Sequence, residues 1–353
     1  MNVFAVTGSS DLAQVFMADM GNGRMVEFVE ALQPPYPRNE RWILMVSTMY
    51  GCPVKCLFCD AGGDYQGRPT AEEILRQVDY LVRRWYPDGR VPAKKFKIQF
   101  ARMGEPAFNT AVLEALEQLP GRYDAPGLMP SVSTIAPHGA DGFFEALIHI
   151  KNHLYAGGRF QFQFSVHTTD ATARDRLIPV RKWTFAQMAE YGDRFYRPGD
   201  RKITLNFALA DGFPADPAVL RHYFDPARYV VKLTPINPTV RASQNGLLTR
   251  INPCQPETGQ KIALEMMAAG YETILAVGEV EENAIGSNCG QYVMRYLSSR
   301  QTVGDAYTYQ PHELIRQPSM VAEATANHAR FDHVKAAHGF DKSSVGRGSV
   351  IQR

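Results

Sequence analysis

The chain is poor in cysteine, nearly neutral in charge and free of long apolar runs. It has five cysteines among 353 residues, three of them clustered, which fits a reducing compartment rather than a disulfide framework. A formal net charge of +2 gives no sign of a nucleic-acid partner. No apolar stretch approaches the roughly 20 residues that span a bilayer, and residues 1–22 lack the basic region and apolar block of a secretory leader. These absences predict a soluble, cytoplasmic protein with no membrane partner.

The chain is long enough to bury a large core, since 45% of its 353 residues are hydrophobic and 21% are charged. From Arg41 onward, apolar runs of strand length alternate with longer amphipathic stretches, which is typical of successive β-α units around a parallel sheet. Six strands are expected, at residues 42–47, 95–100, 130–133, 160–166, 203–209 and 229–233, with one more apolar run at 273–277. This pattern predicts the α/β class and a partial (β/α)6 barrel, whose chemistry lies on the loops after the strands.

The two ends of the chain depart from this rhythm. Residues 13–19 and 24–32 flank the turn Met20-Gly21-Asn22-Gly23 and predict a β-hairpin. After Cys289 the periodicity decays, and the tail at 307–353 mixes Gly, Ser, Ala and His. The predicted units are an N-terminal β-hairpin extension (1–34), the partial barrel (35–285), and the Cys289 loop with a C-terminal tail (286–353).

Three cysteines, Cys52, Cys56 and Cys59, lie in one loop with the spacing CxxxCxxC. Three thiolates at this spacing can bind three irons of one [4Fe-4S] cluster and leave the fourth iron without a protein ligand. The amine and carboxylate of S-adenosylmethionine (SAM) can chelate that iron, and an electron from the cluster then cleaves the sulfonium to a 5'-deoxyadenosyl radical. The alternatives are a structural zinc site and a chance cluster of thiols. Zinc normally needs a second pair of ligands, and the sequence offers no such pair.

Several short segments that follow the expected strands match one enzyme family in order. They are Met103-Gly104-Glu105-Pro106, Val132-Ser133-Thr134, Ser165-Val166-His167, Arg174-Asp175, Ile178-Pro179, Pro235-Ile236-Asn237-Pro238 and Asn288-Cys289-Gly290-Gln291. With the cysteine loop, this set resembles the RlmN/Cfr type of radical SAM enzymes, which methylate an adenine of 23S ribosomal RNA. The resemblance covers residues 13 to about 295 and is specific as a set, although each segment alone is a weak signal.

The resemblance and the positions after strands predict the SAM contacts. The predicted cofactor-binding residues are Gly104, Glu105, Ser133, Ser165, His167 and Asn237. Glu105 offers a carboxylate to the SAM amine, and Gly104 lets the backbone approach a ligand closely. The serines and Asn237 offer hydroxyl and amide groups to the SAM carboxylate, ribose and adenine, whereas His167 is interpreted as a positioning residue. The alternatives are an exposed acid in a turn for Glu105 and ordinary strand-end caps for the others.

The resemblance also implies two catalytic residues, Cys289 and Glu27. In the family, the matching cysteine is methylated by one SAM, and the radical from a second SAM abstracts hydrogen from that methyl group. The carbon radical adds to the substrate, and the matching glutamate takes a proton from the adduct. The alternatives are a buried structural cysteine and a solvated hairpin charge, because Glu30 lies nearby on the same strand.

The chain departs from the family in two ways. The family has a second cysteine seven residues before the first cluster ligand, which resolves the covalent adduct by forming a disulfide, and this chain has Met45 there. Cys254 is the only other candidate for that task, and Cys289 is then either a methyl carrier or vestigial. Family members that act on ribosomal RNA carry a helical RNA-binding domain ahead of the hairpin, whereas twelve residues precede residue 13 here.

We therefore predict a radical SAM enzyme that acts on a substrate other than ribosomal RNA, with a small molecule as the best expectation. The predicted reaction is transfer of a methyl or larger alkyl group to carbon, or a radical rearrangement. An external electron donor such as flavodoxin or ferredoxin is the expected partner. The second expectation is an RNA adenine methyltransferase that uses the tail to bind RNA. A non-catalytic iron-sulfur sensor or electron carrier would need no SAM pocket, and the predicted SAM-binding residues argue against it.

Overall fold

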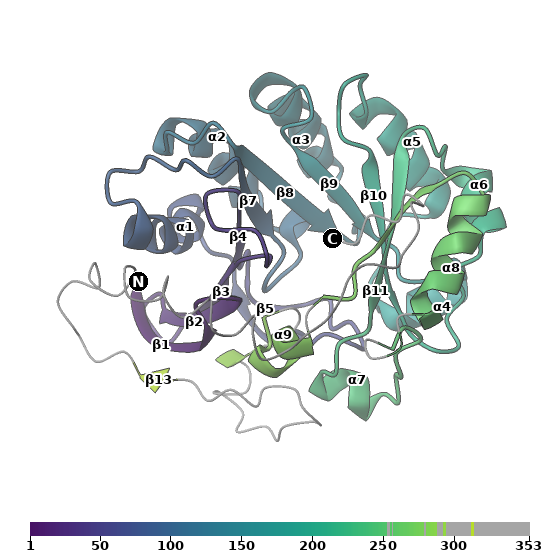
Figure 1. Ribbon diagram of the computed structural model, residues 1–353, viewed down its shortest axis with the longest axis horizontal. Coiled ribbons are helices and arrows are strands. Elements are labelled where there is room, and N and C mark those ends of the chain that lie inside the picture. Colours follow the sequence, from purple (N-terminus) through teal and green to yellow (C-terminus); the bar gives the residue numbers. More distant parts are fainter. Residues whose placement is uncertain (253–254, 256, 279, 288–291, 294–311, 314–353) are drawn as a thin grey trace.

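The computed structural model describes residues 1–252, 255, 257–278, 280–287, 292–293 and 312–313. Within them, one 11-stranded sheet has the order β12-β11-β10-β9-β8-β7-β4-β3-β2-β1-β13 (Figure 1). Its strands are β1 (Asn2–Ser9), β2 (Ala13–Asp19), β3 (Met25–Ala31), β4 (Arg41–Val46), β7 (Lys95–Phe100), β8 (Leu128–Thr134), β9 (Gln161–Ser165), β10 (Ile203–Leu209), β11 (Tyr229–Pro235), β12 (Glu272–Leu275) and β13 (His312–Glu313). The short strands β5 (Tyr50–Cys52) and β6 (Gly63–Gly67) form a separate antiparallel pair.

The strands from β4 to β12 in this order are all parallel to their neighbours. The helices are α1 (Ala71–Trp85), the one-turn η1 (Pro106–Phe108), α2 (Ala111–Arg122), α3 (Asp141–Leu154), α4 (Ala171–Leu177), α5 (Phe185–Phe195), α6 (Pro217–Tyr223), α7 (Val240–Gln244), α8 (Glu257–Ala268) and α9 (Val280–Ile285). In Figure 1, α1, α2, α3, α5, α6 and α8 lie along the outside of the curved sheet, whereas α7 and α9 lie at the bottom of the view. This arrangement confirms the predicted α/β class, in which successive β-α units build a parallel sheet.

The two faces of the parallel strands differ in polarity, because successive side chains of a strand point to opposite sides. On β7, Phe96, Ile98 and Phe100 are fully buried in the core that lies against the helices, whereas Lys97 and Gln99 on the other face are half-buried. The core is therefore on the helix side. The opposite, polar face is the side on which a ligand can contact the strands.

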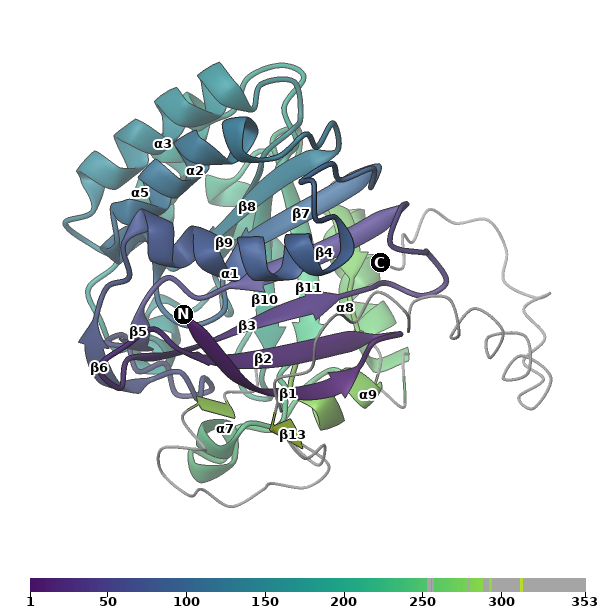
Figure 2. The ribbon, with the colours of Figure 1, turned by 90° about the vertical axis from the view of Figure 1, so that its left-hand side faces the viewer.

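The predicted hairpin is present and joins the same sheet. Strands β2 and β3 pair antiparallel from Ala13 opposite Ala31 to Asp19 opposite Met25. On its other side, β3 pairs antiparallel with β4. Figure 2 shows β3, β2 and β1 extending the sheet beyond β4. Strand β1 was not expected from the sequence, and α9 packs on β1 and β2 through an apolar cluster that includes Ile285. No helix in the described part of the chain is long and apolar enough to cross a membrane.

Candidate functional site

The cysteine loop follows β4, the first strand of the parallel series, as the barrel prediction requires. Its first cysteine lies on β5, which pairs with β6. Gly51 has a φ of +73°, and a Cβ there would lie 2.6 Å from the carbonyl oxygens of Gly63 and Asp64. Only glycine fits at such a close approach of two backbones. This glycine fixes how the chain enters the loop that carries Cys52.

Cys52 is buried, and Cys56 and Cys59 are half-buried; all three are free thiols. They lie in an apolar cluster whose other members include Val54, Ile135, Leu177, Phe213 and Ile236. Burial raises the pKa of the Cys52 thiol to about 11 and that of Cys56 to about 12, and backbone N–H groups directed at Cys52 oppose this rise. The thiols of Cys52 and Cys56 are therefore protonated at neutral pH unless a cation binds them.

The donor set fits an iron-sulfur cluster better than a single ion. Among the described residues, no group of three His, Cys, Asp or Glu side chains is placed to hold one metal ion. In a [4Fe-4S] cluster each cysteine binds a different iron, so its three sulfurs need not converge on one point. Three thiols of one loop in an apolar cluster, with N–H groups directed at Cys52, are the donors that such a cluster needs.

The loop is held against the segment that follows β11. The carboxylate of Asp60 accepts hydrogen bonds from the N–H groups of Val240 (2.9 Å) and Arg241 (2.8 Å) at the start of α7. Arg241 donates in return to the carbonyl of Cys56 at 3.1 Å, and Thr239 donates to that of Phe58 at 2.8 Å. These contacts were not predicted, because they join residues about 180 positions apart with no local pattern. They place the predicted SAM-binding segment around Asn237 beside the cysteines.

Glu105 lies directly after β7 and is buried, not exposed in a turn as one alternative held. Its carboxylate accepts hydrogen bonds from the hydroxyl of Thr134 (2.5 Å) and from the N–H groups of Ala107 and Ile135 (3.0 Å each). Burial raises its pKa to about 7 against the effect of these donors. Four lone-pair sites on a carboxylate leave room for one more donor, so a ligand amine can still bind here.

Gly104 has a different neighbour from the one expected. Its φ is +105°, and a Cβ would lie 2.4 Å from Cγ and 2.6 Å from Cβ of Met49. The missing side chain therefore makes room for Met49 of the preceding loop. The predicted close approach of Gly104 to a ligand would be a second role of this glycine.

Ser133 and Ser165 lie on the polar face of the sheet. Both are half-buried, and the register places Ser133 beside Gln163 and Ser165 beside Asn206. Asn237 is half-buried after β11. The structure thus places these three predicted SAM contacts on β8, at the end of β9 and after β11, three strands of the same parallel series, and their roles stay predictions.

His167, after β9, is buried with a φ of +65°. Its Nδ1 accepts a hydrogen bond from the N–H of Ala208 at 3.0 Å, so the neutral ring carries its proton on Nε2. Burial, with the nearby Arg174 cation, lowers its pKa to about 3. The ring contacts Phe58 of the cysteine loop edge-to-face at 4.8 Å. The ring therefore contacts the cysteine loop, and its role as a positioning residue stays a prediction.

Arg174 joins the loops after two strands. Its guanidinium donates to the carbonyls of Trp183 (2.9 Å), Ile135 (3.1 Å) and Ser165 (3.3 Å), and the side chain is buried. Burial lowers its pKa to about 10. The sequence placed Arg174 in a matching segment but gave it no role, since bonds to three distant carbonyls leave no sequence signal.

Glu27 lies on β3 and is 0% exposed, so the alternative of a solvated hairpin charge is wrong. Arg102 is its ion-pair partner, and the N–H of Val293 donates to the carboxylate at 3.0 Å. Burial raises the pKa of Glu27, and Arg102 opposes that rise. Met45 lies on β4 beside Val29 and Gln99. Cys289 and Cys254 lie outside the described residues.

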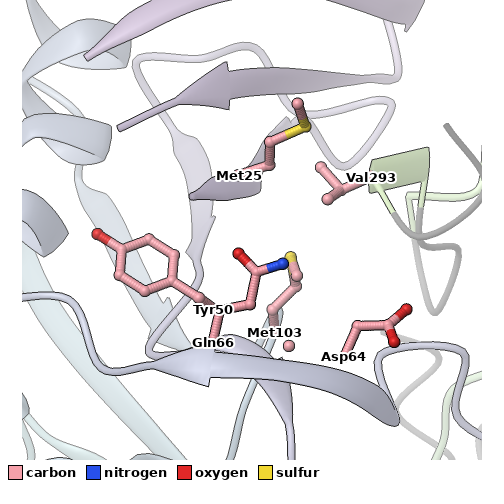
Figure 3. Close-up of a pocket in the computed structure, with 7 residues that line it drawn as sticks. Met25, Tyr50, Asp64, Gln66, Met103 and Val293 are labelled. Carbon is pink, nitrogen blue, oxygen red and sulfur yellow. The ribbon is translucent and has the colours of Figure 1, made fainter. Parts of the chain in front are cut away.

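A small pocket lies between the cysteine loop, the hairpin and the residues after Cys289. Figure 3 shows Met25 and Val293 on one side of it, and Tyr50, Gln66, Met103 and Asp64 on the other. Gly51, the residue before Cys52, completes the lining. The pocket is therefore lined both by the residue before Cys52 and by Val293.

Comparisons with known proteins agree with this geometry. No protein-family profile matches the chain. A probable dual-specificity RNA methyltransferase RlmN from Desulfitobacterium hafniense DCB-2 is 29% identical over 301 residues, which are 83% of this chain and 78% of that protein. The protein of the same name from strain Y51 is 31% identical over 238 residues, 65% of this chain and 64% of that protein. A radical SAM methyltransferase from Sphaerobacter thermophilus has the same fold, with a TM-score of 0.61, 20% identity, and coverage of 82% of this chain and 81% of its own.

The parallel sheet and the cysteine loop after its first strand, together with these relatives, support one class for the protein, that of the radical SAM enzymes. Within that superfamily the chain is RlmN/Cfr-like, as the order of its motifs predicted.

Proposed function

We propose that the protein cleaves SAM reductively at a [4Fe-4S] cluster held by Cys52, Cys56 and Cys59, and transfers a methyl or larger alkyl group to carbon of a small molecule. When bound, the cluster supplies the electron that cleaves the sulfonium of SAM, and a flavodoxin or ferredoxin would reduce the cluster again. Glu105 binds the amine of SAM. Ser133, Ser165 and Asn237 bind its other polar groups; this assignment is supported by their positions at the same edge of the parallel sheet.

His167 and Arg174 serve this site by positioning it. The neutral His167 ring packs against Phe58, which lies between Cys56 and Cys59 in the sequence. This contact fixes the position of the cysteine loop relative to the sheet. Arg174 fixes the carbonyls after β8 and at the end of β9, beside Ser165. Neither side chain needs to touch SAM for these effects, because both act through the backbone or through an aromatic contact.

One observation favours a substrate other than ribosomal RNA: the carboxylate of Glu27 is engaged by Arg102 and by the N–H of Val293. In the RlmN/Cfr type the matching glutamate takes a proton from an RNA adduct, and a cysteine at the position of Met45 resolves that adduct. A thioether cannot form the resolving disulfide. The two groups that would release an RNA product are thus bound elsewhere or replaced, which favours a different reaction.

An RNA adenine methyltransferase is the second candidate. The two curated relatives are named as probable RNA methyltransferases, and their identity to this chain is 29% and 31%. Such an enzyme would need another route to product release, with Cys254 as the remaining thiol.

An experiment with labelled SAM separates the two candidates. The anaerobically reconstituted protein is incubated with reductant and SAM that carries a deuterated methyl group, together with a cell extract that contains small molecules and protein-free 23S RNA. We expect deuterium in the low-mass fraction and none in RNA adenosine, with a Cys56→Ala variant as the control without a cluster. Label in adenosine at multiple turnover would support the RNA candidate, and SAM cleavage without any transferred label would contradict alkyl transfer.

A further inference from the structure

The buried pair of Glu27 and Arg102 contacts the backbone at Gly286, Ser287 and Val293. Arg102 Nε donates to Oε1 of Glu27 at 2.7 Å, Arg102 Nη2 lies 2.5 Å from the same oxygen, and the side chains are 1% and 0% exposed. This buried ion pair between two planar groups restricts how either side chain can turn. The pair joins β3 of the hairpin to the loop that follows β7.

The remaining hydrogen bonds of the pair go to backbone on both sides of residues 288–291. Arg102 Nη1 donates to the carbonyl of Ser287 at 2.6 Å, and Nη2 donates to that of Gly286 at 2.8 Å. On the other side, the N–H of Val293 donates to Glu27 Oε2 at 3.0 Å, and the N–H of Tyr292 also bonds to the carboxylate. One ion pair thus binds the chain before and after the Asn288-Cys289-Gly290-Gln291 motif.

The hydrogen bonds also bear on the chemistry of Glu27. A carboxylate has about four lone-pair sites. The Nε–H of Arg102 and the backbone N–H groups of Tyr292 and Val293 bond to the carboxylate, and Arg102 Nη2 lies 2.5 Å from Oε1. Both oxygens of Glu27 are therefore engaged by the protein, which leaves the carboxylate poorly placed to take a proton from a substrate.

We propose that Glu27 and Arg102 form a clamp that positions the Cys289 segment, and that Glu27 acts through this clamp and not as the proton acceptor. The inference depends on the proposed function only for the importance of Cys289, since the clamp itself consists of described contacts. Val293 is both bound by the clamp and part of the pocket wall, so release of the segment would also open the pocket beside Gly51. Arg102 and Glu27 are positioning residues for that wall.

Hydrogen exchange with mass spectrometry tests the clamp in the reconstituted holoenzyme without any substrate. In Glu27→Gln and Arg102→Met, we expect amides in peptides that cover 280–293 to exchange about ten to a hundred times faster, while α1 and β7 keep their protection. The matched control is Asp200→Asn, which weakens another buried pair, with Lys151, whose side chains are 9% and 1% exposed, and should leave residues 280–293 unchanged. Unchanged exchange at 280–293 in Glu27→Gln would overturn the clamp.

A double variant keeps the test valid if either single variant fails to fold. Removing one partner of a buried pair leaves an unpaired charge, whereas Glu27→Leu with Arg102→Met removes both charges and is tolerated better. We expect the double variant to show the same faster exchange at 280–293.

Alkylation of the thiols then separates a clamp from a base. If the clamp holds the segment, Arg102→Met and Glu27→Gln raise the alkylation rate of Cys289 alike and leave that of the cluster cysteines unchanged. If Glu27 were only a base, Arg102→Met would leave exchange and alkylation as in the native protein, which would overturn the proposal. Because neither readout needs turnover, a wrong reaction class would leave this result intact.

Discussion

Glu105 combines ligand binding with support of its own loop. Its carboxylate holds Thr134 and two backbone N–H groups while one acceptor site stays available. A buried acid with a raised pKa near a cofactor loop is a common feature of functional sites.

Glu105→Gln should weaken SAM binding by about ten- to a hundredfold, because a charge-assisted contact is lost. Thr134→Val is the matched control, since it removes one neighbour of Glu105 and keeps the carboxylate. We expect its SAM dissociation constant to rise by less than about tenfold. Anaerobic calorimetry on both reconstituted variants measures the difference. Equal effects in the two variants would mean that Glu105 only supports the loop.

His167 predicts a pH dependence of stability. Its pKa is about 3 in the folded chain against 6.5 in the unfolded chain. As pH falls below 6.5, the unfolded chain takes up a proton that the folded chain does not, so the free energy of unfolding decreases until pH nears 3. The slope from this residue is at most about 1.4 kcal/mol per pH unit.

The measurement is urea unfolding of the iron-free protein at about pH 7.5 and about pH 5. His167→Gln is the control, because its amide oxygen can still accept the Ala208 N–H and does not titrate. We expect the native protein to lose about 2 kcal/mol more than the variant between the two pH values. The same loss in both proteins would show that other groups carry the pH dependence.

Residue roles were predictable where the chemistry is local. Cys52, Cys56 and Cys59 lie within one loop, so their spacing alone indicates a cluster. The contacts of the Glu27–Arg102 pair were not predictable, because Arg102 is 75 positions from Glu27, and the carbonyls of Gly286 and Ser287, to which Arg102 donates, lie a further 184 and 185 positions along the chain. No period or motif in a single sequence reports such contacts.

The loops after the strands depend on close backbone contacts that single substitutions can test. Gly104→Ala would place a Cβ against Met49, whereas Gly21→Ala, at nearly the same φ of +106°, has nothing within 4 Å. We expect a loss of about 1 kcal/mol for Gly21→Ala from backbone strain alone, and a further 1–3 kcal/mol, approximately, for Gly104→Ala from the clash. Urea unfolding midpoints measure both. Equal losses would show that Met49 simply moves aside.

Strands in which apolar residues recur at regular spacing were predicted well, and short strands without such a pattern were missed. The hairpin strands and the parallel series match because their apolar residues recur at strand spacing. Strands β5 and β6 escaped notice because they are short and rich in glycine, and Tyr65 on β6 is exposed. Their pairing is imposed by the way the cysteine loop folds back.

The order of the strands places the predicted SAM-binding residues along one edge of the sheet. Parallel strands end at one edge, so Glu105, Ser133, Ser165 and Asn237 lie along it although they span 133 positions of the sequence. The antiparallel extension adds Glu27 and, through Arg102, the segment on either side of Cys289. The site thus lies where the two parts of the sheet adjoin.

The most direct test is iron analysis with a SAM cleavage assay on the anaerobically reconstituted chain and five single cysteine-to-alanine variants. We predict about four irons per chain and 5'-deoxyadenosine upon reduction in the native protein. Variants at Cys52, Cys56 and Cys59 should lose both, and variants at Cys254 and Cys289 should keep the irons. Stoichiometric zinc without SAM cleavage in the native protein would contradict the assignment of this chain as a radical SAM enzyme.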